Sequence, residues 1–211
     1  DLPFPGGVRL PATATLCRLP AGQLLLHAPL RLDDSAAAEL AALGDVTHIV
    51  APNRYHHLFV AAAARRFPRA KLWAAPGLAA KRPDLPWHAT LGDSAPDEWQ
   101  GALQPALIDG APVLNEVVFL HPATQTLVTT DLVFHVREPM TWATRFALRT
   151  MGSHDRLAQS RWWWLYTRDR AKWRASLERV LAWDFRRVAM SHGTAVEVDA
   201  AGLRAALWLL R

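Results

Sequence analysis

The sequence predicts a single α/β domain, in which short buried strands alternate with helices and a tryptophan-rich helical insert lies near the C-terminus. A length of 211 residues suffices for one large domain with a substantial core. Short apolar runs end repeatedly at Pro, Asn, Asp or Gly, which is typical of strands separated by turns. From residue 137 to residue 184 the apolar positions instead recur at helical spacing. We therefore expect one domain over 1–211 with an insert over 137–184.

The composition is that of an ordinary soluble domain. Hydrophobic residues make up 51% of the chain and charged residues 20%. No apolar run approaches the roughly 18 residues of a membrane span. The first residues show no basic stretch followed by an apolar core, so a cytoplasmic location is expected. Cys17 is the only cysteine in the sequence, which excludes an intrachain disulfide and a cysteine-based zinc site.

The positive charge is diffuse. The formal net charge is +5, and its basic residues occur in short doublets instead of long runs. Examples are Arg65-Arg66, Lys81-Arg82 and Arg186-Arg187. No recognised DNA- or RNA-binding motif accompanies them, so we do not expect a nucleic-acid partner.

The first half of the chain reads as strands with interspersed helices. Strands are expected at 8–10, 14–19, 23–30, 46–50 and 71–75. A helix over 36–43 has N-cap candidates at 33–35 and a closing glycine at 44. A second helix is expected over 58–67. The connection over 76–105 contains five prolines and is expected to be mostly irregular.

The second half begins with strands and then becomes helical. Strands are expected at 103–108, 116–120 and 126–130, and the last two form a hairpin around 121–125. Helical spacing then covers 140–151 and 161–183. A final strand at 187–190 precedes a C-terminal helix over 203–210.

Side chains that can bind a metal follow four of the expected strands. His27 ends one strand, His56 and His57 follow the next, Asp131 follows the hairpin and His192 follows the final strand. Residues at strand ends of an α/β sheet can converge on one edge. A single histidine is more often a core or surface residue than a ligand, but the repeated placement favours a site. Three imidazoles and a carboxylate suit zinc, iron or manganese.

The order of these residues resembles the metallo-β-lactamase fold superfamily. In that superfamily a His-x-His-x-Asp-His motif follows a strand, a loop histidine comes later, and a strand-end Asp and a Gly-His-Gly-like turn complete the site. Here residues 51–57 occupy the place of the main motif, Asp131 matches the strand-end Asp, and Ser-His-Gly at 191–193 matches the turn. The Leu-His-Ala-Pro stretch at 26–29 is similar to the domain of unknown function 4336 family. The resemblance implies a four-layer αββα sandwich with a metal site at one edge.

Departures from the motif reduce the implied site. With His57 aligned on the last motif histidine, Pro52 and Arg54 replace the first two histidines, and His56 replaces the motif aspartate. The later loop, over 110–116, carries no histidine. The resemblance therefore implies one divalent ion, zinc first, with iron or manganese as alternatives. Its implied ligands are His56, His57, Asp131 and His192.

Two functions fit this reduced site. In the first, a hydrolase, the ion polarises a carbonyl or phosphoryl oxygen and activates water, with His27, Glu116 and Asp131 as catalytic groups. In the second, a metal-free protein binds a small molecule or a partner, and Arg54 with Asn53 holds an anionic group. Redox chemistry on the same fold is a third reading. The fold alone does not select among these functions.

Three consecutive tryptophans, Trp162 to Trp164, form the most unusual stretch of the chain. On a helix they cover about 200° of its surface, so they cannot all face one core. One reading buries two indoles and packs the third on a neighbouring loop. Another makes the stretch a lid, a homodimer contact or an interfacial patch with the nearby arginines.

Overall fold

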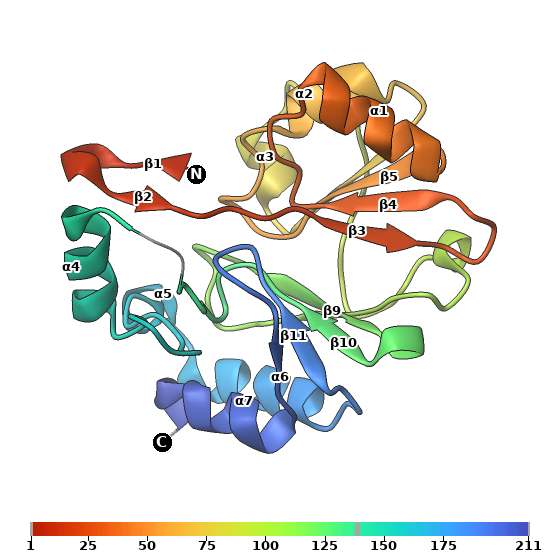
Figure 1. The fold of residues 1–211 in the computed structure, drawn as a ribbon. Helices are drawn as coiled ribbons and strands as arrows, with labels where there is room; N and C mark the ends of the chain where they lie inside the picture. The colour runs from red at the N-terminus through yellow and green to blue at the C-terminus, as the bar shows by residue number, and fades with distance from the viewer. Residues whose placement is uncertain (1, 138–139, 211) are drawn as a thin grey trace.

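The computed structural model describes residues 2–137 and 140–210. Within them, two five-stranded sheets face each other and helices cover their outer faces (Figure 1). A small hairpin of β1 (Leu2–Pro3) and β2 (Arg9–Leu10) lies at one end of the sandwich. The implied αββα sandwich is confirmed.

The first sheet contains the N-terminal strands. Its order is β3 (Thr15–Arg18), β4 (Leu24–His27), β5 (Val46–Ala51), β6 (Lys71–Ala74) and β7 (Trp87–Thr90). The strands from β4 to β7 run parallel, and β3 is antiparallel to β4. The connection over 76–105 was expected to be mostly irregular, and this prediction is wrong at β7. The strand escaped prediction because it is a half-buried edge strand that lies between prolines and lacks a continuous apolar run.

Helices of the first half cover the outer face of this sheet. They are α1 (Asp34–Leu43), α2 (Val60–Arg66) and α3 (Leu78–Lys81). The expected caps of α1 are present: the Asp33 side chain accepts a hydrogen bond from the backbone N–H of Ala36, and the Gly44 N–H bonds to the Leu40 carbonyl. Side chains at the end of β5 show why its last three residues are all apolar. Val50 packs between the sheets, whereas Ile49 and Ala51 pack under the helices.

The second sheet contains the later strands. Its order is β12 (Val196–Glu197), β11 (Arg187–Ala189), β10 (Thr126–Val128), β9 (Val117–His121) and β8 (Gln104–Leu107). The expected hairpin is confirmed as antiparallel β9 and β10, while β10 and β11 run parallel. The strand over 187–190 was expected to be the last, but β12 follows it. Two residues at a sheet edge are too few for a sequence pattern.

The expected insert divides into parts with different surroundings. Its helices are α4 (Trp142–Met151), α5 (Trp163–Tyr166) and α6 (Arg170–Leu181). α6 packs with α7 (Ala200–Ala206) on the outer face of the second sheet, so it belongs to a layer of the sandwich. α4 instead contacts the β1–β2 hairpin region (Figure 1). Residues 138–139 of the insert lie outside the described residues.

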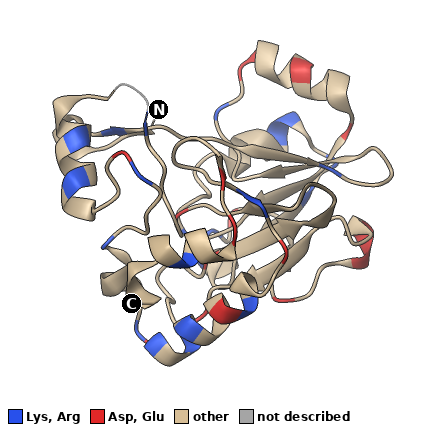
Figure 2. Ribbon diagram, turned by 60° about the horizontal axis from the view of Figure 1, so that its bottom comes forward, with Lys and Arg blue, Asp and Glu red and all other residues tan. Residues whose placement is uncertain are grey.

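The tryptophan stretch buries one indole. Trp163 is buried, while Trp162 and Trp164 are each 53% exposed, so the reading with two buried indoles is wrong. Lys and Arg are spread over several helices and loops, mixed with Asp and Glu (Figure 2). Among the described helices, none combines the length and apolar character needed to cross a bilayer.

Candidate metal centre

The candidate site lies where three strands end. Asn53 and His56 are in the loop after β5, Asp131 follows β10, and His192 follows β11. β10 and β11 run parallel with Val128 paired to Ala189, so Asp131 and His192 each come three residues after a paired position. The parallel register therefore brings these two side chains to the same edge of the sheet.

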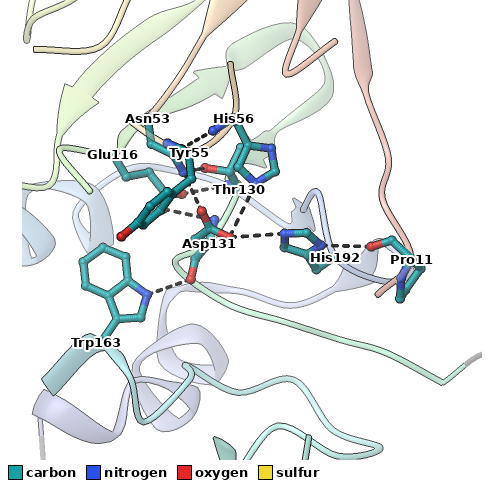
Figure 3. Close-up of polar contacts among 9 residues, drawn as sticks. All are labelled: Pro11, Asn53, Tyr55, His56, Glu116, Thr130, Asp131, Trp163 and His192. Carbon is teal, nitrogen blue, oxygen red and sulfur yellow. Dashed lines mark hydrogen bonds and ion pairs between the residues drawn. The ribbon is translucent and has the colours of Figure 1, made fainter. Parts of the chain in front are cut away.

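Asp131 is the centre of the site. Its Oδ1 atom lies 3.5 Å from Nε2 of His56 and 3.2 Å from Nε2 of His192 (Figure 3). One ligand atom from each residue falls within 4.8 Å of the other two. Burial opposes ionisation of Asp131, but the charges and hydrogen bonds of both imidazoles outweigh it and hold its pKa well below the usual range. Burial likewise opposes protonation of His192, yet Asp131 raises its pKa above the ordinary value.

The spacing of these atoms fits a divalent ion. Ligand atoms at zinc–nitrogen or zinc–oxygen bond lengths in a tetrahedral site are separated by about 3.3 Å. The measured separations of 3.2 and 3.5 Å bracket that value. Nδ1 of His192 lies 2.9 Å from the Pro11 carbonyl and donates to it, so Nε2, which faces Asp131, is the ring nitrogen available to an ion. A backbone acceptor behind the imidazole is the usual support of a metal-binding histidine.

Asn53 connects the histidine loop to Asp131. Its amide nitrogen donates to Asp131 Oδ2 at 2.7 Å and to Thr130 Oγ1 at 2.9 Å. Its amide oxygen accepts from the backbone N–H groups of Tyr55 and His56, both at 2.8 Å. The side chain is completely buried and its groups are used within the protein. The expected substrate contact does not fit this placement, and Asn53 instead orients His56 and Asp131.

Glu116 supports Asp131 from behind. Its carboxylate accepts the backbone N–H groups of Thr130 at 2.7 Å and Asp131 at 3.0 Å (Figure 3). Burial, followed by the neighbouring Asp131 charge, raises the pKa of Glu116 to about 7. On the other side, Trp163 Nε1 donates to the Asp131 carbonyl at 2.7 Å. Glu116 was expected to be a catalytic group, but it is completely buried and holds the backbone of the site.

The structure does not bring His57 into the cluster. Its Nδ1 atom lies 3.0 Å from a guanidinium nitrogen of Arg82, which in turn pairs with Asp84. Burial, and then the charges of Lys81 and Arg82, lower the pKa of His57. A ligand role was expected for His57, but a cationic neighbour is the reverse of what a metal-binding histidine needs.

His27 is enclosed behind the site. It ends β4, is buried, and meets the ring of Phe119 edge-on with ring centroids 5.3 Å apart. Among the described residues neither ring nitrogen has a hydrogen-bond partner. Burial, followed by the charge of His56, lowers the pKa of His27 to about 3. The imidazole is therefore neutral, and the expected role as a proton shuttle does not fit its surroundings.

Arg54 faces away from the cluster. Its guanidinium donates to the Pro112 carbonyl at 2.7 Å, and it is not among the residues that line the pocket beside the cluster. The expected anion contact therefore does not fit its placement. Lys81 lines that pocket instead and donates to the Arg54 carbonyl at 2.7 Å. Sequence reasoning missed Lys81 as a residue of the pocket wall, because the Lys81-Arg82 doublet resembles any other pair of surface cations.

A pocket of about 430 Å³ opens beside the cluster, and His56, Asp131 and His192 form part of its wall. Much of the rest of the wall comes from the β1–β2 hairpin, the β5–α2 loop, the end of α4 and the tryptophan stretch. Sequence reasoning also missed Trp163 as a contact of Asp131, although the tryptophan run was the available signal.

Comparisons with known proteins agree with this architecture. No curated protein matches the chain. A metallo-β-lactamase from Pontibacter korlensis superposes with a TM-score of 0.66 at 14% identity, over 100% of this chain and 92% of that one. The FIM-1 metallo-β-lactamase from Pseudomonas aeruginosa, in a mono-zinc form, gives 0.61 at 13% identity, over 96% and 85%. TTHA1623 in a di-iron-bound form gives 0.59 at 17% identity, over 94% and 97%.

Identities this low show the shared fold and nothing finer. The family model described as Domain of unknown function (DUF4336) matches residues 6–158, which is more than half of the chain. The chain therefore belongs to the DUF4336 family and has the metallo-β-lactamase fold.

Proposed function

We propose that the protein is a metal-dependent hydrolase whose single divalent ion is held by His56, Asp131 and His192. The observation that carries the proposal is the Asp131 carboxylate between two imidazole nitrogens at 3.2 and 3.5 Å, with the tautomer of one imidazole fixed by a backbone carbonyl. When bound, such an ion polarises a carbonyl or phosphoryl oxygen and lowers the pKa of a coordinated water. Zinc is the first choice, with iron or manganese as alternatives.

The residues of the chain supply orientation. Pro11 fixes the ring of His192, while Asn53 and Glu116 fix the side chain and the backbone of Asp131. Rigid support of this kind keeps a site close to its working geometry. Asp131 also lines the pocket, so an ion that it holds would face a bound substrate.

A single ion is supported by what surrounds the rest of the loop. The charged neighbours of His57 are Lys81, Arg82 and Asp84, and the two positive charges against one carboxylate disfavour a second cation there. Structures of similar fold have been described in mono-zinc and di-iron forms, so both one and two ions occur on this architecture. The cationic flank favours one for this chain.

Metal analysis combined with chelation tests the proposal. Purified protein should hold about one ion per chain and should hydrolyse at least one of a panel of activated esters, thioesters, lactams and phosphodiesters. Chelation should abolish that activity and added zinc should restore it. His192→Ala should lose both ion and activity, whereas His121→Ala should keep both, because His121 pairs with the start of β10 at the opposite end from Asp131. Activity that survives complete chelation would exclude the proposed mechanism.

The metal-free alternative loses part of its basis. It assigned an anionic group to Arg54, whose guanidinium is hydrogen-bonded to Pro112 outside the pocket. The alternative would hold if the folded chain binds a ligand, contains no metal and gains none on addition of zinc. The protein would then be a metal-free binding protein.

A further inference from the structure

The pocket beside the cluster has a mainly apolar wall. Aliphatic and aromatic side chains from separate segments converge there, among them Leu10, Leu30, Leu114, Phe134 and Met151. Among the described residues, the carboxylate and ammonium side chains that line it are those of Asp131 and Lys81. A volume of about 430 Å³ lies within the range of small-molecule sites. A wholly polar substrate would leave most of this wall without a complementary partner.

The mouth of the pocket is apolar as well. Four large hydrophobic side chains that are substantially exposed also line the pocket. They are Phe4, Tyr55, Leu58 and Trp162. Exposed apolar groups gathered at a concave site usually mark a binding surface, whereas single ones are ordinary. Their position around a cavity that contains the proposed ion site connects them to a ligand of that site.

We infer that the site takes a substrate with a bulky apolar group, such as the ester of a medium-length acyl chain, and that this group fills the pocket while the scissile carbonyl faces His56, Asp131 and His192. The inference rests on the proposed function for the reaction, but the apolar binding itself does not require the ion. Hydrolysis of such an ester adds water across the acyl C–O bond and releases the carboxylic acid and the alcohol. Water is the only co-reactant.

The experiment measures binding of straight-chain 1-alkanols from butanol to decanol by calorimetry, in the metal-loaded and in the chelated protein. Burial of each added methylene should tighten binding about fourfold until the pocket is full. The same increments are expected without the ion, because the apolar wall does not depend on it. Chain-length dependence without any chelator-sensitive hydrolysis would refute the proposed function and retain the apolar site. Affinity that is flat with chain length would overturn the inference.

Two matched pairs of variants locate the site. Trp162 and Trp164 are equally exposed at 53%, but Trp162 lines the pocket and Trp164 does not. Leu58 and Leu165 are 64% and 63% exposed, and again the first alone lines the pocket. Trp162→Ala and Leu58→Lys should weaken decanol binding by about tenfold, and Trp164→Ala and Leu165→Lys by less than about twofold. Equal losses within each pair would overturn the inference.

Sedimentation of the same variants tests a second copy of the chain as the occupant. Wild type and the Leu58→Lys variant should both sediment as monomers. A dimer that this substitution dissociates, with decanol affinity unaltered, would assign the apolar surface to self-association and contradict the substrate site.

Discussion

The two sides of the β5–α2 loop have opposite electrostatic surroundings. His56 faces the Asp131 carboxylate, which His192 also contacts and which Asn53 and Glu116 hold in place. His57, the next residue, faces the guanidinium of Arg82. Adjacent histidines therefore differ in whether their partner attracts or repels a cation.

This difference shows how half of a metal motif can be retained. A carboxylate with its own hydrogen-bond partners stays ionised when buried and can offset the charge of an ion. On the other side, the resemblance aligns Pro52 and Arg54 with two motif histidines, and Lys81 and Arg82 add positive charge. The half of the motif that is retained contains His56 and Asp131, and the residues that support Asp131, Asn53 and Glu116, are present as well.

The largest expected effect follows removal of the carboxylate. Asp131→Asn keeps the size of the side chain but takes away its charge, so metal affinity should fall by more than about 100-fold. Even residues behind the ligands typically contribute 10–100-fold. Competition with a coloured zinc chelator measures the loss. The flank control Arg54→Met should retain the ion, and an equal loss in both variants would contradict the comparison.

Asn53→Ala should have the next largest effect. It removes the amide that orients Asp131 and the acceptor of two backbone N–H groups. We expect metal affinity to drop about 10–100-fold and the free energy of unfolding to drop by about 2–3 kcal/mol. Chelator competition and urea titration measure the two changes. Wild-type metal affinity in this variant would remove Asn53 from the support of the site.

The histidine behind the loop offers a test by pH. The pKa of His27 is about 3 in the folded chain and about 6.5 as an unperturbed side chain. As the pH falls below 6.5 the unfolded state takes up a proton that the folded state refuses, so stability is lost. The loss is about 1.4 kcal/mol per pH unit. His27→Leu should remove this component, making its stability decline more shallowly than that of wild type between pH 6 and 4. Urea unfolding at a series of pH values measures both stabilities. The same pH dependence in wild type and His27→Leu would contradict the assignment of His27 as buried and neutral.

The smallest effect concerns the pKa of His57. Arg82→Ala removes a neighbouring charge that lowers this pKa, so the value should move upward toward that of an ordinary histidine. The pKa should recover only in part, since burial, the larger cause, remains. NMR titration of the ring protons measures it, and metal content should stay unchanged. A downward shift would show that Arg82 is not the neighbour that matters.

Much of the fold was readable because it is local. The caps of α1 and the β9–β10 hairpin follow from residues close in sequence, and β4 begins with a continuous apolar run because both of its faces are buried. β7 and β12 escaped prediction because short edge strands carry too few apolar residues for a pattern.

The site was predictable only to the level of which residues end strands. Placement after parallel strands correctly brought Asp131 and His192 together. His57 is held outside the cluster by its contact with Arg82, 25 residues away. Asn53 is held by Thr130 and Asp131, across the sandwich. Such partners are set by tertiary packing, so sequence spacing could not distinguish His56 from His57.

The most direct test is the metal content of two single variants at the neighbouring histidines. Elemental analysis of zinc-loaded protein, after removal of free ion, should give about one ion per chain in wild type. His57→Ala should keep that ion and His56→Ala should lose most of it. Loss of the ion in His57→Ala with retention in His56→Ala, or a wild-type chain that holds no metal, would contradict the account.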